Sequence, residues 1–289
     1  MENKINDFMY IYMYNLEKFL LSKKETLDTI SFQSDEANTD RPLKEYLKKL
    51  IENEFNKIPD DSGIKNLNIE NKHESSLYDY DDLYISNVLL PEEITPDIKN
   101  TIKELKSAVY TNPDMCFIIT DGSSVFYETI ELKSTKQDSI PGSSIQQILP
   151  DEWVIFIKHT QTSIDVITGK YINSINSKMQ FPDRSPRPEV SFKELKNWNK
   201  KHRNKSNNTL SYSVDTESNE KFELISDWQK VLSDRWIEML FESNTVKKNE
   251  PWFNNNMRKF IISFLSEYES LSSDEQIAFK NKITNLIQE

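Results

Sequence analysis

Acidic residues and lysines recur in one short pattern along this chain. The tripeptide Glu-Leu-Lys occurs three times, at residues 104–106, 131–133 and 194–196. A Pro-Asp pair stands upstream of each copy, at residues 96–97, 113–114 and 182–183. Carboxylates that lie close together are good ligands for Mg²⁺, and a neighbouring lysine can orient or help to deprotonate a metal-bound water. The pattern therefore predicts metal-assisted phosphodiester hydrolysis wherever the fold brings one Asp, Glu and Lys together.

The middle copy of the pattern has the local sequence of a β-hairpin. Residues 115–120 are an apolar run, Asp121-Gly122 is a turn signal, and residues 125–133 are rich in β-formers. Counted back from a turn centred near 122, Asp114 lies roughly opposite residue 130. The hairpin therefore brings Asp114 to the strand that carries the second carboxylate.

Strand geometry favours this middle copy over the other two. Because side chains alternate along a strand, Glu131 and Lys133 point to one face and Leu132 to the other. The copy at 104–106 lies in a helical pattern, where residues two apart diverge, and the copy at 194–196 lies in a polar segment without strand character. The hairpin copy is thus the candidate site, with a solvated cross-strand pair as the alternative.

Composition limits the class of protein and the kind of metal site. The 289 residues are 36% hydrophobic and 11% aromatic, which indicates a globular protein with a real core. No apolar run approaches the ~20 residues of a membrane span, and the first residues lack the order of a secretion signal. One Cys and three dispersed His exclude a disulfide framework and a Cys- or His-rich zinc site. We expect a cytoplasmic protein without membrane association, whose metal ligands would be mostly oxygens.

Positive charge is concentrated in one segment of an acidic chain. Between Lys170 and Lys205 there are ten Lys or Arg and three acids, a local charge of +7, whereas the whole chain carries −11. Such asymmetry suggests that one surface binds a polyanion while the rest of the body repels it. An ordinary solvated basic surface is the alternative.

Hydrophobic periodicity predicts a mixed sheet between helices. Helical spacing extends over most of residues 1–60, over 95–110, and over 222–243, 251–268 and 273–288. Residues 59–82 are polar and predict a loop, and strands are expected at 115–120, 125–133, 153–157 and 163–167. This order predicts an α/β fold with a central mixed sheet flanked by helices. We expect one domain over 1–289, with a helical N-terminal part (1–110), a core (111–205) and a helical C-terminal part (206–289).

Pro113-Asp114 and Glu131-Leu-Lys133 resemble the PD-(D/E)XK nuclease motif. The stretches 131–156 and 181–188 make the chain resemble type II restriction endonucleases in particular, over about residues 110–200. The resemblance implies a mixed α/β core in which Asp114 and Glu131 bind Mg²⁺ and Lys133 serves the attacking water. Many members add an acid from a preceding helix. Here Glu54 is the candidate for that third ligand, with Glu52 or Glu45 as alternatives.

Several residues near this motif have side chains suited to DNA. Ser143 and Ser144 stand at a predicted helix N-terminus, where they would either receive a phosphate or only cap the helix. The prolines of residues 182–188 would hold Arg184 and Arg187 for contacts with guanine, although Arg184 could instead pair with Asp183. The remaining candidates are amides for bases or backbone and cations for phosphates, namely Gln146, Gln147, Lys196, Lys200, Lys201 and Arg203.

The resemblance implies a type II restriction endonuclease that uses Mg²⁺ to hydrolyse double-stranded DNA at a specific sequence, leaving 5′-phosphates. A symmetric site calls for a homodimer, and a cognate DNA methyltransferase is expected as a companion but not as a bound subunit. One alternative is a nicking or repair-type endonuclease, or one subunit of a heterodimeric restriction enzyme. Another is a non-catalytic, sequence-specific DNA-binding protein in which the Glu131–Lys133 pair is only structural.

Overall fold

The computed structural model of the chain contains two compact units, Met1–Ser226 and Asp227–Glu289. The residues it describes are 2–30, 41–70, 73–106, 113–145, 148–160, 163–180, 187–213, 217–242 and 252–287. The first unit holds the central sheet and the candidate site, and the second is helical. None of the described helices is long and apolar enough to cross a membrane.

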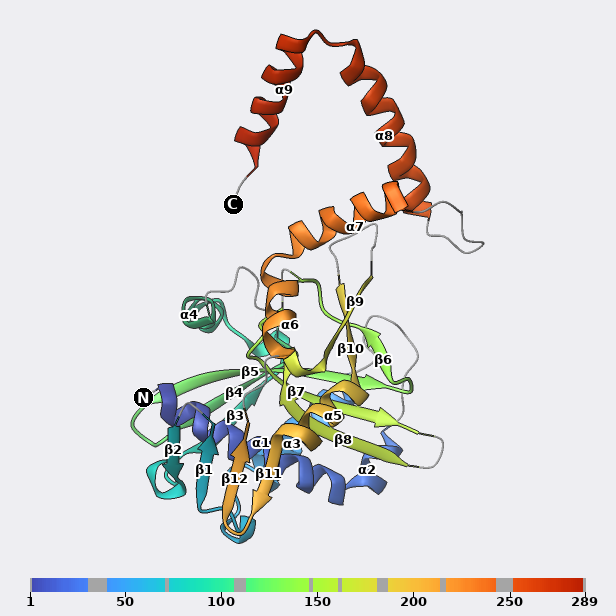
Figure 1. The fold of residues 1–289 in the computed structure, drawn as a ribbon. Helices are drawn as coiled ribbons and strands as arrows, with labels where there is room; N and C mark the ends of the chain where they lie inside the picture. Colours follow the sequence, from blue (N-terminus) through green and yellow to red (C-terminus); the bar gives the residue numbers. More distant parts are fainter. Residues whose placement is uncertain are drawn as a thin grey trace. The chain divides into compact units, whose positions relative to one another are not determined.

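A five-stranded mixed sheet forms the centre of the first unit (Figure 1). In spatial order its strands are β3 (Tyr84–Leu89), β4 (Met115–Thr120), β5 (Val125–Thr135), β7 (Trp153–His159) and β8 (Ile164–Lys170). Neighbouring strands are antiparallel except β5 and β7, which run parallel and therefore need a longer connection between them. The predicted mixed sheet and all four of its predicted strands are confirmed.

Helices near the N-terminus cover one face of this sheet (Figure 1). They are α1 (Glu2–Ser22), α2 (Lys24–Thr29) and α3 (Arg41–Glu54). Their apolar side chains share one buried cluster with Phe117, Leu132 and Trp153. The ring centroids of Tyr10 and Trp153 are 5.0 Å apart, and those of Tyr12 and Phe117 are 6.1 Å apart. The predicted N-terminal helices are confirmed, and Leu132 points toward them.

The opposite face of the sheet packs against α4 (Pro96–Lys106) and α5 (Phe192–His202). Cys116 is buried with Ile102 of α4, and the ring of Phe156 meets that of Phe192 of α5 at 5.5 Å. Phe156 is the partner of Lys133 in the parallel β5–β7 register, so both side chains point to this face. Glu131 and Lys133 therefore lie on the side of α5, away from the N-terminal helices.

A four-stranded sheet occupies part of the predicted loop at residues 59–82, so that prediction is wrong there. Its order is β11 (Arg203–Ser206), β12 (Thr209–Tyr212), β1 (Asn66–Ile69) and β2 (His73–Ser76). Strand β1 pairs in parallel with β12, which follows it by about 140 residues and falls in the part predicted to be helical. Because this pairing is long-range, a short polar segment shows no local sign of it.

A three-stranded sheet contains β6 (Ser139–Pro141), β10 (Arg187–Ser191) and β9 (Ile175–Gln180). Strand β6 occupies the start of the segment in which a helix N-terminus was predicted. Beyond it, Ile148 N donates to Ile145 O at 3.4 Å and Glu152 N donates to Leu149 O at 3.0 Å. The first Glu-Leu-Lys lies in α4, as predicted, and the third lies in helix α5.

From Glu217 onward the described chain is helical, as the periodicity predicted for residues 222–243, 251–268 and 273–288. Helix α6 (Glu217–Ser226) ends the first unit, and the second contains α7 (Trp228–Glu242), α8 (Trp252–Ser270) and α9 (Ser273–Leu286). No described residue of α8 or α9 is buried.

A tight turn at residues 121–124 fixes the hairpin of β4 and β5. Gly122 has a φ of +87°, a conformation that glycine adopts without strain. The Asp121 carboxylate accepts hydrogen bonds from Ser123 N at 2.9 Å and from Ser124 N at 2.8 Å. These bonds, led by that from Ser123 N, lower the pKa of Asp121 to about 2. The turn sets the strand register and hence the face to which each residue of β5 points.

We expect Asp121→Ala to lower the free energy of unfolding at pH 7. The folded-state pKa lies below the ordinary value, so the charge stabilises the fold above that value, and its contribution falls as the pH drops toward about 2. Urea unfolding should show that the free energy of unfolding of Asp121→Ala differs less from that of wild type at pH 3 than at pH 7. Asp121→Asn keeps one acceptor oxygen, so its stability should lie between those of wild type and Asp121→Ala. Equal stability of all three proteins at pH 7 would contradict a stabilising role for the Asp121 carboxylate.

Candidate active site

The hairpin brings Asp114, Glu131 and Lys133 together. Met115 pairs with Ile130, so the same register sets Asp114 opposite Glu131, one residue from the predicted position. Asp114 Oδ2 accepts the backbone N–H of Leu132 at 2.9 Å, which ties the aspartate to β5. Lys133 Nζ donates to Glu131 Oε1 at 2.5 Å. Two carboxylates and an ammonium thus converge at one end of the hairpin.

Ser143, which is itself bound to Tyr171, contacts the Glu131 carboxylate from a second direction. Ser143 Oγ donates to Glu131 Oε1 at 2.7 Å, and Ser143 N donates to the Tyr171 hydroxyl at 3.1 Å. A Cβ at Gly142 would lie 2.7 Å from that hydroxyl, so glycine allows the close approach. Tyr171 is almost fully buried, and nothing in the local sequence pattern marked it. Ser143 therefore contacts a candidate metal ligand, and Ser144 is half-buried beside it.

A second lysine enters the site from α3. Lys44 Nζ donates to Asp114 Oδ1 at 2.6 Å, and both side chains are mostly buried. The sequence predicted an acid from this helix, but the residue that reaches Asp114 is the lysine beside Glu45. The amphipathic pattern of α3 showed which face is buried, but not which of its turns lies beside the hairpin.

The three candidate acids of α3 all have partners elsewhere. These partners are Lys23 for Glu54 (2.7 Å), the N–H of Val88 for Glu52 (2.9 Å) and Arg41 for Glu45 (2.8 Å). Glu54 stands ten residues after Lys44, which along a helix is about 15 Å. The structure therefore does not bring Glu54 to Asp114, and among the described residues no third carboxylate joins Asp114 and Glu131 as a metal ligand.

Burial and charge shift the pKa values of the central pair. Burial raises the pKa of Glu131 above its ordinary value, and the Asp114 carboxylate adds to this although Lys133 opposes it. Burial is the largest single influence on Lys133 and by itself would lower its pKa, but the nearby Glu131, Tyr171 and Asp114 together outweigh it and the pKa is raised. Lys133 is therefore protonated at neutral pH and acts in this arrangement as a hydrogen-bond donor.

The donor set fits Mg²⁺ better than a zinc ion. Across the described residues, no three His, Cys, Asp or Glu side chains are grouped so that they could hold a metal. Mg²⁺ commonly takes only one or two protein carboxylates and completes its shell with waters and substrate phosphate. Asp114 and Glu131 supply such a pair, whereas zinc sites use mainly Cys and His ligands, and no cluster of such ligands occurs among the described residues.

The candidate DNA-binding residues have different surroundings. Gln146, Gln147 and Arg184 lie outside the described residues and remain predictions. Arg187 is exposed at the start of β10, and Lys200 and Lys201 are exposed in the last turn of α5. Lys196 is exposed on the same helix, where its Nζ donates to Asp165 at 2.5 Å.

Arg203, in contrast, is part of an internal ion pair. Its guanidinium donates to Glu17 at 2.9 and 2.5 Å, and its side chain is only 11% exposed. Glu17 also accepts the N–H of Thr168 at 2.8 Å, so the pair joins α1, β8 and β11. Because this cation is buried and paired with Glu17, the structure does not offer it to a phosphate. The charge pattern of the sequence could not show this, since it does not distinguish a buried cation from an exposed one.

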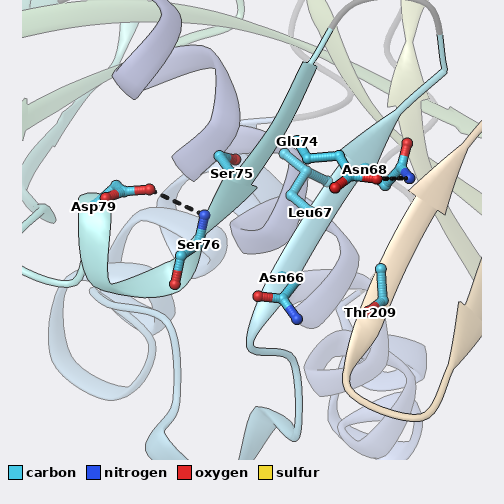
Figure 2. A pocket seen from close by; sticks show the side chains of 8 residues that line it. All are labelled: Asn66, Leu67, Asn68, Glu74, Ser75, Ser76, Asp79 and Thr209. Carbon is cyan, nitrogen blue, oxygen red and sulfur yellow. Dashed lines mark hydrogen bonds between the residues drawn. The ribbon is translucent and has the colours of Figure 1, made fainter.

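A pocket of about 360 Å³ lies on the four-stranded sheet (Figure 2). Its lining residues are Asn66, Leu67, Asn68, Glu74, Ser75, Ser76, Asp79 and Thr209. None of the predicted site residues belongs to it. The lining contains two carboxylates and no cation, and therefore does not suit a polyanion.

We expect Arg203→Met to lower the free energy of unfolding by roughly 3 kcal/mol, because Glu17 would be left buried without its cation. Lys200→Met, on the exposed end of α5, should change it by less than about 0.5 kcal/mol. Urea unfolding followed by circular dichroism at pH 7 compares the two. If the two variants were equally stable, the ion pair would not be structural and Arg203 would again be a candidate for contact with DNA.

Comparison with known proteins identified no relative. No protein-family model matches the chain, and neither a curated protein nor a solved structure matches it. Its function is therefore inferred from the residues and their geometry.

Proposed function

We propose that this chain is a Mg²⁺-dependent deoxyribonuclease that cuts double-stranded DNA at a specific sequence, as type II restriction endonucleases do. The observation that supports this most is the convergence of Asp114, Glu131 and Lys133 on one face of the hairpin. Two other Glu-Leu-Lys copies exist, but both lie on helices. The mixed sheet with flanking helices is compatible with the core that the resemblance implies, and its assignment to the PD-(D/E)XK fold belongs to the proposal.

Each side chain of the site has a role in the proposed hydrolysis. Asp114 and Glu131 would hold Mg²⁺, which when bound favours deprotonation of its water and stabilises charge on the attacked phosphate. The protonated Lys133 donates hydrogen bonds from Nζ and can orient the attacking water or a phosphate oxygen. Ser143 keeps Glu131 and Lys133 in place, since its hydroxyl lies within 2.7 Å of the first and 3.5 Å of the second. Attack of water on phosphorus would break the P–O3′ bond, so that one product keeps a 5′-phosphate and the other leaves with a 3′-hydroxyl.

The basic face of α5 supports a nucleic-acid substrate. Lys193, Lys196 and Lys200 follow one another at helical spacing and are exposed. Helix α5 packs through Phe192 on the face of the sheet to which Glu131 points. The exposed lysines of α5 and the candidate metal ligands thus lie on the same side of the sheet, as an interface that tracks a nucleic-acid backbone would require.

The partners follow from the same proposal. A palindromic site would be read by a homodimer, because protein symmetry mirrors the symmetry of the site. A methyltransferase of matching specificity would protect the host DNA without forming part of the complex. If the chain nicks one strand, or needs a second subunit, the same catalytic residues apply and only the products change.

One observation favours a second candidate function. Both carboxylates of the site are paired with lysines, Asp114 with Lys44 and Glu131 with Lys133. Ion pairs of this kind also occur as purely structural contacts. A non-catalytic DNA-binding protein that uses the α5 lysines is therefore the alternative.

We expect purified protein with Mg²⁺ to cut plasmid DNA into discrete fragments. Asp114→Asn, Glu131→Gln and Lys133→Ala should each slow cleavage on the order of 10³-fold or more, because each removes a metal ligand or a group next to the attacking water. Glu194→Gln is the matched control, since it changes the same tripeptide on helix α5 and should cut normally. Nicked circles alone would indicate the nicking alternative, and binding without Mg²⁺-dependent cleavage would indicate the non-catalytic one.

We expect Lys200→Ala and Lys201→Ala to weaken binding of cognate and scrambled duplexes alike. Each should reduce the slope of log affinity against log salt by about 1, because a phosphate contact acts through counterion release. Arg187→Ala should instead cost roughly 1–3 kcal/mol on the cognate duplex only. Titrations in Ca²⁺ at several salt concentrations distinguish the two effects.

Lys4→Ala, on α1 at the opposite face of the sheet, serves as the control and should bind both duplexes like wild type. An equal loss on both duplexes for Arg187→Ala would make that residue a phosphate contact rather than a reader of bases.

A further inference from the structure

The carboxylates of the proposed site are held as two separate ion pairs. Lys44 Nζ lies 2.6 Å from Asp114 Oδ1, and Lys133 Nζ lies 2.5 Å from Glu131 Oε1. The four side chains are between 11% and 23% exposed. Charges buried to this extent are screened only weakly by salt, so each ammonium acts strongly on any cation that approaches its carboxylate.

The charge balance of the site depends on its ligands. Two carboxylates and two ammonium groups sum to zero, so a lone divalent cation would leave the free site with a charge of +2. One phosphodiester and one hydroxide would each bring a negative charge and restore neutrality. Electrostatics therefore disfavours the metal on its own and favours it together with a DNA phosphate.

Lys44 differs from Lys133 in where it comes from. It lies in the first turn of α3, whereas Lys133 belongs to the same strand as Glu131. Helix α3 is anchored to its neighbours by Lys48, which donates to Glu93 at 2.6 Å, and by Glu52, which accepts the N–H of Val88. The backbone of Lys44 is thus held in place, so that only a rotation of its long side chain would be needed to separate it from Asp114.

We propose that Lys44 is a positioning residue that keeps Asp114 paired in the free protein, so that Mg²⁺ binds tightly only together with DNA. This inference rests on the proposed nuclease function. Coupling of this kind is reciprocal: DNA raises the affinity for the metal and the metal raises the affinity for DNA by the same factor. It would prevent the protein from holding a loaded metal, and an activated water, in the absence of its substrate.

The test is calorimetric titration of Mg²⁺, and of Mn²⁺ as a second probe, into the free protein without DNA. Lys44→Met and Lys44→Gln remove the charge, and the second keeps a donor for Asp114. Both should bind the metal about tenfold or more tightly than wild type, because one repelling unit charge is gone. Lys44→Arg keeps the charge and should bind as weakly as wild type.

Lys48→Met is the matched control, since Lys48 stands one turn later on α3 and pairs with Glu93 instead of Asp114. Its metal affinity should equal that of wild type. Adding Asp114→Asn to Lys44→Gln should abolish the gain, which shows that the metal binds at this aspartate. A simple structural role for Lys44 would change stability in urea but not metal affinity.

Two results separate this inference from the proposed function. If wild type cuts DNA and the Lys44 variants bind Mg²⁺ no more tightly than it does, the inference about Lys44 is wrong and the nuclease proposal stands. If no variant binds Mg²⁺ or Mn²⁺ at Asp114 and wild type does not cut DNA, both are wrong.

Discussion

The antiparallel register of β4 against β5 is the constraint on which the proposed site depends. Pairing of Met115 with Ile130 sets Asp114 opposite Glu131 and turns Leu132 into the core beneath the N-terminal helices. A slip of one residue would bury the two charged side chains of Glu-Leu-Lys in that core and expose the leucine. The parallel strand β7 fixes β5 from its other side. Burial of apolar side chains on one face of the sheet thus fixes the strand register, and this register places Glu131 and Lys133 on the other face.

The site is assembled from segments that are far apart in the chain. Helix α3 supplies Lys44, the hairpin supplies the motif, and residues near 143 and 171 supply a hydroxyl and a buried phenol. The polar contacts form a chain from Tyr171 through Ser143 and Glu131 to Lys133. Because each group is held by at least one other, the arrangement is organised before any ligand arrives, which is what a catalytic or metal-binding constellation requires.

Partners, rather than charge alone, decide what each cation of the basic segment can do. Arg203 and Lys200 stand three residues apart in the sequence, but the first closes a bidentate pair with Glu17 and the second faces solvent. A planar, fully charged guanidinium is well suited to a buried pair, whereas an exposed lysine is a flexible point charge suited to phosphate. The segment therefore combines a structural cation with exposed cations available to a polyanion.

The local sequence determined the elements that depend on local interactions: the N- and C-terminal helices, the hairpin turn at Asp121-Gly122 and the alternation that separates Glu131 from Leu132. These follow from periodicity and turn chemistry, which act over a few residues. Tertiary structure alone decided the pairing of β1 with β12, the burial of Arg203 and the choice of Lys44 over Glu54. Helical periodicity shows which face of α3 is buried but not which turn reaches Asp114, because that depends on contacts between residues 70 positions apart.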